Sequence, residues 1–308
     1  MNILVFGAGA MGSVFAGFLS KENNVTVIGR AEHVDAINQH GLQITGIWGE
    51  HIFTEIHAHT SVAKIPVDES FDLILVTTKS YGTVQAVDEI KPFIGEGAAV
   101  MSMQNGIGNE DTISSVVGVE NTMGGMAIFG ARLTSPGCAE VTVFASECLV
   151  GDLTVGVTKR ANEIANVFSQ AGIPTKASDN IIRDKWMKAF YNIALNPLSA
   201  ILRVPYGELG DKDATKEIMK NLLQEAFTVA EKLGVPLKFT WSEYYDYLLE
   251  TQLPPTASHK SSMLQDLERG RRTEIDYLNG AVAALGKRLE IPTPVNETIT
   301  NLIKSLER

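Results

Sequence analysis

The sequence predicts an α/β fold: an N-terminal domain with a parallel β-sheet, followed by an all-helical C-terminal domain. Three observations support this prediction. Short apolar runs alternate with helical patterns in the first half, a glycine-rich turn follows the first run, and strand patterns nearly vanish after about residue 180. Alternating strands and helices are typical of βαβ units, and hence of a parallel sheet.

The first domain contains short runs of apolar and β-branched residues, as buried parallel strands require. Strands are expected at 2–6, 25–28, 72–77 and 98–102, and helices at 12–19, 31–40 and 81–91. The segments 42–46 and 51–57 suggest an inserted hairpin, and a glycine-rich stretch with strand character covers 121–150.

The second domain is predicted to consist of amphipathic helices. Their patterns cover 180–202, 212–233, 240–251, 258–269 and 274–289, separated by breakers such as Gly234-Val235-Pro236. The change of pattern near residue 179 predicts two domains, 1–179 and 180–308. A ligand site is expected at a domain junction of this kind.

Charge and composition exclude several classes of protein. The chain has 308 residues, with 26 basic and 36 acidic side chains and a net charge of −10 at pH 7. A surface of this sign repels nucleic acid, no window suits a membrane span, and no signal peptide is recognisable. The two cysteines, Cys138 and Cys148, form neither a CxxC pair nor a zinc knuckle. We therefore expect a cytoplasmic monomer or homodimer without nucleic-acid or membrane partners.

The glycine-rich turn is the strongest local signal for a cofactor. Gly7-Ala8-Gly9-Ala10-Met11-Gly12 follows the first strand and opens a helix, which is the context of a Rossmann-type dinucleotide-binding motif. Gly7 permits a tight turn, Gly9 lets the backbone approach a pyrophosphate, and Gly12 lets helix and strand pack closely. The helix N-terminus adds N–H donors and a positive dipole end. The alternative is a glycine-rich turn that binds nothing.

The residue after the second strand predicts the type of nicotinamide cofactor. NAD sites usually place a carboxylate there, but this chain has Gly29-Arg30. A guanidinium can hold a 2′-phosphate in fork geometry, so Arg30 favours NADP. The alternative is an exposed loop arginine. Glu32 is expected to act as a favourable charge in the first turn of the next helix.

The first helix of the second domain carries a polar row. Lys188, Asn192 and Asn196 follow the spacing i, i+4, i+8 and span only about 80° of the helix circumference. Asparagine is a mediocre helix former, and lysine is rarely buried without a partner. A lysine shielded from water is a candidate proton donor near neutral pH. Alternatively, the asparagines bind carbonyl groups in a helix–helix contact.

Three other clusters have simpler explanations than a functional site. Glu55, His57 and His59 alternate along a predicted strand, and we interpret them as a solvated face because no fourth metal ligand has suitable spacing. No metal is therefore expected. The basic run at 269–272 is interpreted as solvated, and the tyrosines at 244–247 as a helix that packs some rings inward.

Several motifs follow one another along the chain: the glycine-rich turn, Thr78-Lys79, Gln104-Asn105-Gly106-Ile107-Gly108, Lys185-Trp186-Met187-Lys188 with Asn192 and Asn196, Ser261-Ser262-Met263-Leu264-Gln265-Asp266, Arg272-Thr273-Glu274-Ile275-Asp276, Gly280 and Pro292-Thr293-Pro294. With these motifs, the chain resembles the ketopantoate reductase (2-dehydropantoate 2-reductase) family over nearly its full length.

The resemblance implies NADPH-dependent reduction of 2-dehydropantoate to pantoate, in pantothenate and coenzyme A biosynthesis. It implies a Rossmann-type domain followed by a helical domain like the C-terminal domain of 6-phosphogluconate dehydrogenase. It also implies that Lys188 protonates the ketone oxygen, and that Glu274 contacts the hydroxyl side of the substrate and helps to set the charge of the site.

The remaining site residues are also assigned by resemblance. Ser262 is expected to hold the substrate carboxylate, while Asn192, Asn196 and Asn105 contact the substrate. The expected cofactor contacts are the glycine-rich turn, Arg30 on the 2′-phosphate, Lys79, Asn105 and Glu274. Two alternatives stay open: a reductase of a different small 2-oxo acid, and a non-catalytic protein that senses NADPH.

Overall fold

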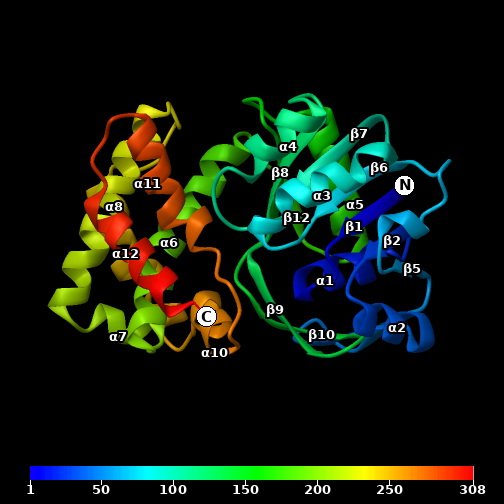
Figure 1. The fold of residues 1–308 in the computed structure, drawn as a ribbon, viewed down its shortest axis with the longest axis horizontal. Coiled ribbons are helices and arrows are strands. Elements are labelled where there is room, and N and C mark those ends of the chain that lie inside the picture. The colour runs from blue at the N-terminus through cyan, green and yellow to red at the C-terminus, as the bar shows by residue number, and fades with distance from the viewer. Residues whose placement is uncertain (308) are drawn as a thin grey trace. The chain divides into compact units, whose positions relative to one another are not determined.

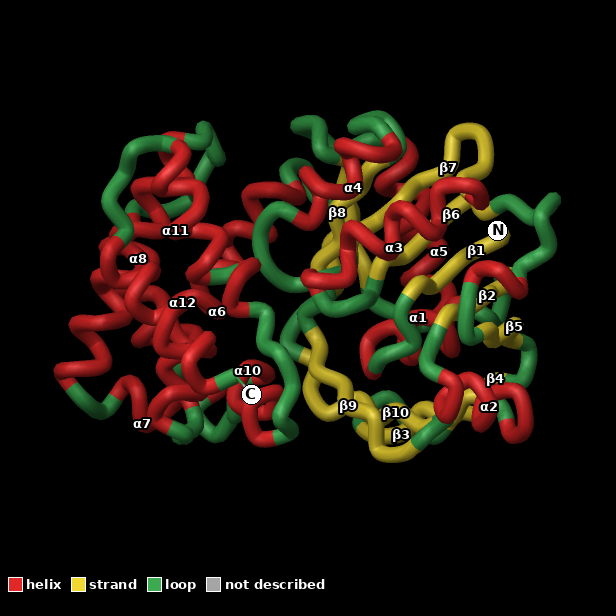
Figure 2. The backbone as a smooth tube through the Cα atoms, viewed as in Figure 1, coloured by secondary structure: helices red, strands yellow, loops and turns green. Residues whose placement is uncertain are grey.

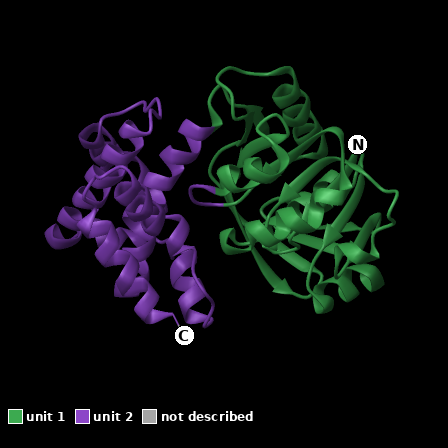
Figure 3. Ribbon diagram, turned by 45° about the horizontal axis from the view of Figure 1, so that its top comes forward, with its two compact units in different colours: residues 1–104, 109–181 green, residues 105–108, 182–308 purple. Residues whose placement is uncertain are grey.

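The computed structural model describes residues 1–307 and confirms the predicted fold class, an α/β unit and a helical unit. Unit 1 comprises Met1–Gln104 and Asn109–Ile181, and unit 2 comprises Asn105–Gly108 and the chain from Ile182 onward (Figure 3). The short loop 105–108 therefore belongs to unit 2, although the strand and helix on either side of it belong to unit 1.

The main sheet of unit 1 has eight strands in the order β12-β11-β8-β7-β6-β1-β2-β5. The strands from β5 to β8 in this order run parallel, whereas β11 is antiparallel to β8. Their bounds are β1 (Asn2–Phe6), β2 (Asn24–Ile28), β5 (Ile56–His59), β6 (Phe71–Val76), β7 (Ile94–Ser102), β8 (Thr122–Met126), β11 (Cys148–Asp152) and β12 (Thr175–Ala177). β1 is buried after its first residue, as its apolar sequence predicts.

Helices cover both faces of this sheet (Figure 1). One core contains buried side chains of α1 and α5, with Phe15 and Phe168 in ring contact at 5.7 Å. The other contains side chains of α3 and α4, including Val87 and Ile113. The helices are α1 (Ala10–Leu19), α2 (Ala31–His40), α3 (Thr83–Ile90), α4 (Asn109–Val117) and α5 (Lys159–Ala171), with 3-10 turns at Val62–Lys64, Ser80–Gly82 and Lys91–Phe93.

A second, four-stranded sheet has the order β4-β3-β10-β9 (Figure 2). Its strands are β3 (Leu42–Gly46), β4 (His51–Phe53), β9 (Phe129–Ser135) and β10 (Cys138–Phe144). β3 and β4 form the predicted hairpin, but residues 56–59 leave it and pair with β2 in the main sheet. The reason is burial: Ile56 and Ala58 pack into the main core, while His57 between them stays exposed.

Unit 2 is helical around one core, in which the rings of Phe190 and Phe227 stack at 3.9 Å and Tyr244 is fully buried. Tyr244 thus confirms that the tyrosine-rich helix packs inward. Its helices are α6 (Ile181–Leu202), α7 (Tyr206–Gly210), α8 (Asp213–Lys232), α9 (Trp241–Tyr247), α10 (Ser262–Glu268), α11 (Asn279–Arg288) and α12 (Pro294–Leu306), with a π turn at Leu248–Gln252 and 3-10 turns at Pro254–Thr256 and Ile275–Tyr277. Among residues 1–307, no helix has both the length and the apolar character needed to cross a membrane.

Candidate active site

The glycine-rich turn joins β1 to α1 and is held by the neighbouring strands. Gly7 has φ +119°, a conformation that favours glycine, and a Cβ at Gly12 would lie only 2.2 Å from the Gly7 carbonyl oxygen. A Cβ at Gly9 would instead meet a single atom within 4 Å, the Gly7 oxygen at 4.0 Å. Gly9 therefore borders open space at the N-terminus of α1, where backbone N–H groups and the helix dipole suit a phosphate.

Two further strand ends are attached to this turn. The N–H groups of Gly7 and Ala8 donate to the Ile28 carbonyl at 3.0 and 2.8 Å, at the end of β2. The Thr77 hydroxyl donates to the Gly7 carbonyl at 2.8 Å, at the end of β6. The carboxyl ends of β1, β2 and β6 thus meet at one edge of the sheet, where such folds bind nucleotides.

The two predicted cationic cofactor contacts follow these strand ends. Arg30 is the N-cap residue of α2, is exposed, and forms no ion pair within residues 1–307. Glu32 lies in the first turn of α2, as predicted. Lys79 is partly buried and precedes the 3-10 turn Ser80–Gly82. Open space at Gly9 and cations after the flanking strand ends fit the phosphates of a dinucleotide.

The buried side-chain amide of Gln104 holds the turn that carries Lys79 by hydrogen bonds. Gln104, at the end of β7, donates from Nε2 to the Thr78 carbonyl at 3.0 Å and to the Thr83 hydroxyl at 2.8 Å. The Ser102 hydroxyl donates to Gln104 Oε1 at 3.3 Å. Gln104, which immediately precedes Asn105 in the chain, therefore connects the turn that carries Lys79 to Ser102 at the end of β7.

The loop that carries Asn105 and the turn that begins at Glu274 are in contact within unit 2. The N–H of Ile107 donates to the Tyr277 carbonyl at 2.8 Å, and the N–H of Tyr277 donates to the Glu274 carbonyl at 3.0 Å. Gly106 has φ +86°, and a Cβ there would lie 2.5 Å from the Tyr277 oxygen. The loop 105–108 therefore packs against the turn that begins at Glu274, which is a buried residue.

The polar row predicted on one helix lies on α6. Lys188 and Asn192 are partly buried, and Asn196 is buried. The Tyr206 hydroxyl donates to Asn196 Oδ1 at 2.5 Å, and burial raises the pKa of Tyr206, so this hydroxyl keeps its proton. The spacing and the continuous helix place the three side chains along one face.

Ser262 is brought to this row by its neighbour. Ser261 is the N-cap of α10: its hydroxyl accepts from the Leu264 N–H at 3.0 Å and donates to the Asn196 carbonyl at 3.2 Å. Ser262 is the exposed first residue of α10. The start of α10 is therefore fixed beside the Asn196 end of the polar row.

A proline inside α6 explains a second anchor. Pro197 has no N–H, so the Ile193 carbonyl lacks its usual helical donor. Asn279 Nδ2 donates to that carbonyl at 3.2 Å and to Asn296 Oδ1 at 3.0 Å. Asn279 thus satisfies the backbone of α6 between Asn192 and Asn196.

Other groups lie away from these contacts. His57 is exposed, which agrees with a solvated face, and residues 1–307 contain no cluster of three or more potential metal ligands. Arg272 forms an ion pair with Asp276 at 3.1 Å, and Arg269 and Arg271 are exposed, as predicted for the basic run.

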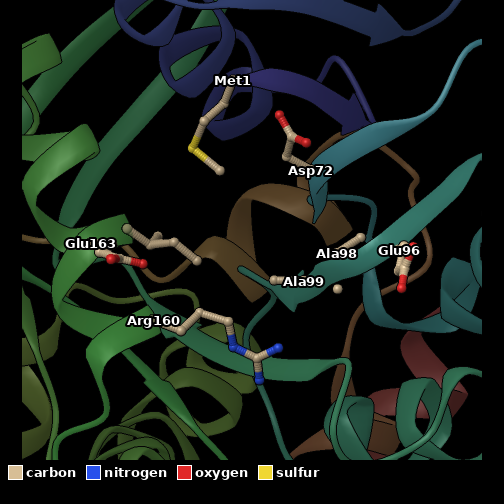
Figure 4. A pocket seen from close by; sticks show the side chains of 9 residues that line it. Met1, Asp72, Glu96, Ala98, Ala99, Arg160 and Glu163 are labelled. Carbon is tan, nitrogen blue, oxygen red and sulfur yellow. The ribbon is translucent and has the colours of Figure 1, made fainter.

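A cavity of about 460 Å³ lies at the opposite end of the main sheet (Figure 4). Its lining includes Met1, Asp72 and Ala98, near the starts of β1 and β6 and within β7, and Arg160 and Glu163 of α5. Arg160 is already paired with Asp152. The cavity is therefore separate from the glycine-rich turn, which lies at the carboxyl end of β1.

These features define the class of protein: a Rossmann-type dinucleotide-binding unit combined with a helical unit that presents a lysine and amide side chains. The family description "Ketopantoate reductase PanE/ApbA" matches residues 3–154, and "Ketopantoate reductase PanE/ApbA C terminal" matches residues 180–307. The chain belongs to the ketopantoate reductase family.

Relatives and solved structures agree with this assignment. A 2-dehydropantoate 2-reductase of Aquifex aeolicus is 35% identical over 310 residues, covering 100% of this chain and 97% of that protein. A PanE/ApbA family ketopantoate reductase of Ralstonia eutropha JMP134 has a TM-score of 0.89 at 30% identity, covering 100% and 98% of the two chains. D-mandelate dehydrogenase with NADH and anilino(oxo)acetate has a TM-score of 0.89 at 32% identity, with the same coverage. The chain is therefore an oxidoreductase that uses a nicotinamide dinucleotide and a small oxo-acid substrate.

Several residues that build the site were not predicted from the sequence. Ser261, Tyr206 and Asn279 support the polar row, and His33 supports the glycine-rich turn. The preference of serine for N-cap positions could have identified Ser261, and a proline within a helical pattern signals that a carbonyl needs another donor. Nothing local identifies Asn279 as that donor.

Proposed function

We propose that this enzyme reduces 2-dehydropantoate to pantoate with NADPH. The observation that carries the proposal is the set of polar groups that unit 2 assembles along α6. Lys188, Asn192 and Asn196 share a face, and the Ser261 contact holds Ser262 beside it. These groups match the substrate, which offers a ketone, a carboxylate and a terminal hydroxyl.

Each side chain has a defined role in this proposal. When bound, the nicotinamide supplies the hydride for the ketone carbon. Lys188 donates a proton from Nζ to the ketone oxygen, which completes the alcohol. Ser262 donates to the substrate carboxylate, and Glu274, an acceptor when ionised, binds the terminal hydroxyl.

The asparagines bind and orient the substrate. Because Asn196 Oδ1 accepts from the Tyr206 hydroxyl, the Nδ2 group of Asn196 is left to donate to the substrate. Asn192 offers a second amide on the same face of α6. In this proposal Asn105, in the loop whose Ile107 N–H donates to the Tyr277 carbonyl, adds a third amide. Together, these donors favour a substrate rich in oxygen acceptors.

The cofactor preference rests on Arg30. Its exposed guanidinium follows β2, where carboxylates hold the ribose 2′-hydroxyl in NAD sites. A carboxylate there would repel a 2′-phosphate, whereas an arginine binds it in fork geometry. Arg30, with Lys79, therefore supports NADPH over NADH.

One observation favours a second candidate, an NADH-linked dehydrogenase of another 2-hydroxy acid. D-mandelate dehydrogenase bound to NADH is as similar in fold as the ketopantoate reductase structure. A role limited to sensing NADPH is less well supported, since cofactor binding needs neither Lys188 nor Ser262.

A substrate panel tests the proposal. Initial rates of cofactor oxidation are measured with NADPH and NADH, each with 2-dehydropantoate, its deoxy analogue 3,3-dimethyl-2-oxobutanoate, and phenylglyoxylate. We expect the highest kcat/KM for 2-dehydropantoate with NADPH, because a site that pairs a substrate hydroxyl discriminates against the analogue that lacks it. A preference for phenylglyoxylate with NADH would support the second candidate, and similar kcat/KM for the first two acids would contradict the role of Glu274.

A further inference from the structure

A buried histidine connects the elements around the glycine-rich turn. His33 lies in the first turn of α2 and is only 5% exposed. Its Nε2 lies 2.9 Å from the hydroxyl of Ser13, the residue after Gly12. Its Nδ1 lies 2.9 Å from the backbone nitrogen of Gly137, in the turn between β9 and β10. One imidazole thus links α1, α2 and the second sheet.

These contacts identify the protonation state of the ring. The Gly137 N–H can only donate, so Nδ1 of His33 must be an unprotonated acceptor. The proton of the neutral ring then lies on Nε2 and is donated to Ser13. A second proton on Nδ1 would place two donors against each other and break the contact with Gly137.

The surroundings offer no compensation for a charged ring. α1 contains no titratable side chain, and Glu32 and Asp35, the acidic residues of α2, are both exposed. On the β9–β10 hairpin, Arg132 and Glu140 pair with each other at 2.6 Å. Cys138, the other titratable group there, donates to Gln43 at 3.5 Å. Burial accordingly lowers the pKa of His33.

We propose that neutral His33 is a positioning residue of the dinucleotide site, which fixes the glycine-rich turn relative to the start of α2. Ser13 follows the turn that faces the pyrophosphate, and Arg30 caps the helix that carries His33. Both phosphate-binding elements are therefore held by one ring. The inference rests on the proposed function in one respect only, the contact between Arg30 and the 2′-phosphate of NADPH.

Protonation of His33 should therefore weaken dinucleotide binding. Above its lowered pKa the ring is neutral and the linkage is intact; below it, the linkage opens. The 2′-phosphate of NADPH also titrates near this range, so the pH dependence of the wild type alone is ambiguous. The informative quantity is the ratio of dissociation constants, variant to wild type, because the phosphate contributes equally to both.

The test compares wild type with His33→Phe, which fills similar space without hydrogen bonds, and His33→Asn, which can keep an acceptor near Gly137. NADPH binding is measured by calorimetry from about pH 8 to about pH 5. We expect His33→Phe to weaken binding about tenfold at the high pH, from the loss of buried hydrogen bonds. The ratio should decrease toward one as the pH falls through the lowered pKa of His33, and His33→Asn should recover part of the affinity.

Controls separate positioning from stability. His57→Asn, at an exposed histidine of β5, should leave the affinity and its pH profile unchanged. If His33→Phe fails to fold, Ser13→Ala removes the hydroxyl acceptor alone and should give a smaller loss with the same trend. A merely structural His33 would lower thermal stability and leave the affinity ratio at one at the high pH, and that result overturns the inference. If wild type binds only NADH, the NADPH proposal fails, and the same ratios are measured with NADH.

Discussion

At the scale of single residues, two cationic side chains, Arg30 and Lys188, distinguish the candidate site. Arg30 stands where a carboxylate would select NAD, and Lys188 is the one ammonium group in a row with two amides. In the proposed function, Arg30 serves cofactor choice and Lys188 serves proton transfer. Single substitutions can therefore separate these steps.

Arg30→Ala should weaken NADPH binding by about tenfold or more, since an ionic contact with the 2′-phosphate is lost. NADH binding should hardly change, because NADH has no 2′-phosphate. Dissociation constants for both cofactors check this, with Arg132→Ala on β9 as an exposed control. Equal losses for NADPH and NADH would show that Arg30 contacts another part of the cofactor.

Lys188→Ala should lower kcat by about 10²-fold or more, as expected when a positioned acid is removed. NADPH binding should survive, because the glycine-rich turn, Arg30 and Lys79 belong to unit 1. Steady-state rates and NADPH titration measure the two effects separately, and Lys232→Ala, at the exposed end of α8, is the control. A kcat near that of wild type would remove Lys188 from the mechanism.

At the scale of elements, α6 contains a proline directly after the polar row, so the geometry of the row depends on groups outside the helix. Asn279 of α11 donates to the Ile193 carbonyl, which Pro197 leaves without a helical donor. Ser261, the N-cap of α10, donates to the Asn196 carbonyl. The position of the asparagine row therefore follows from contacts with two other helices.

Asn279→Ala should destabilise the protein by roughly 1–3 kcal/mol, because it leaves the buried Ile193 carbonyl without a donor and opens a small cavity. The midpoint of urea denaturation measures this change. Asn301→Ala, at an exposed position of α12, should shift the midpoint little. Indistinguishable midpoints for the two variants would mean that the Asn279 contact contributes no net stability.

At the scale of the whole molecule, burial of histidines couples stability to pH. Burial lowers the pKa of His33 and His259, and burial together with the nearby His57 and Lys64 lowers the pKa of His59. The unfolded chain binds protons at these sites at a higher pH than the folded chain does. Stability is therefore fully present above the ordinary histidine pKa of about 6.5 and decreases as the pH falls below it.

The expected result is a lower thermal midpoint at about pH 5.5 than at about pH 7.5, measured by circular dichroism in buffers of equal ionic strength. His33→Asn should show a smaller decrease than wild type, because one of the linked groups is gone. His40→Asn, at an exposed histidine at the end of α2, should behave almost like wild type. A midpoint that is constant, or higher at the acid pH, would contradict the linkage to these histidines.

The fold class and much of the site could be predicted from the sequence because their signals are local. The glycine-rich turn has its meaning between a strand and a helix, and the asparagine row on α6 follows from helical periodicity alone. Four helices, α4, α5, α7 and α12, were not predicted, although apolar residues recur at helical spacing in two of them, at Ile164, Ala165 and Phe168 in α5 and at Ile299 and Ile303 in α12.

What the sequence by itself determined was the alternation of strands and helices in the first unit, the helical character of the second unit, the turn at Gly7–Gly12 and the shared face of Lys188, Asn192 and Asn196. Only the tertiary structure decided that 56–59 joins β2, that Ser261 binds the Asn196 carbonyl, and that the loop 105–108 packs on Tyr277. The physical reason is the distance along the chain over which each interaction acts. Periodicity and turn chemistry act over a few neighbouring residues, whereas a hydrogen bond between distant segments depends on how the complete core packs.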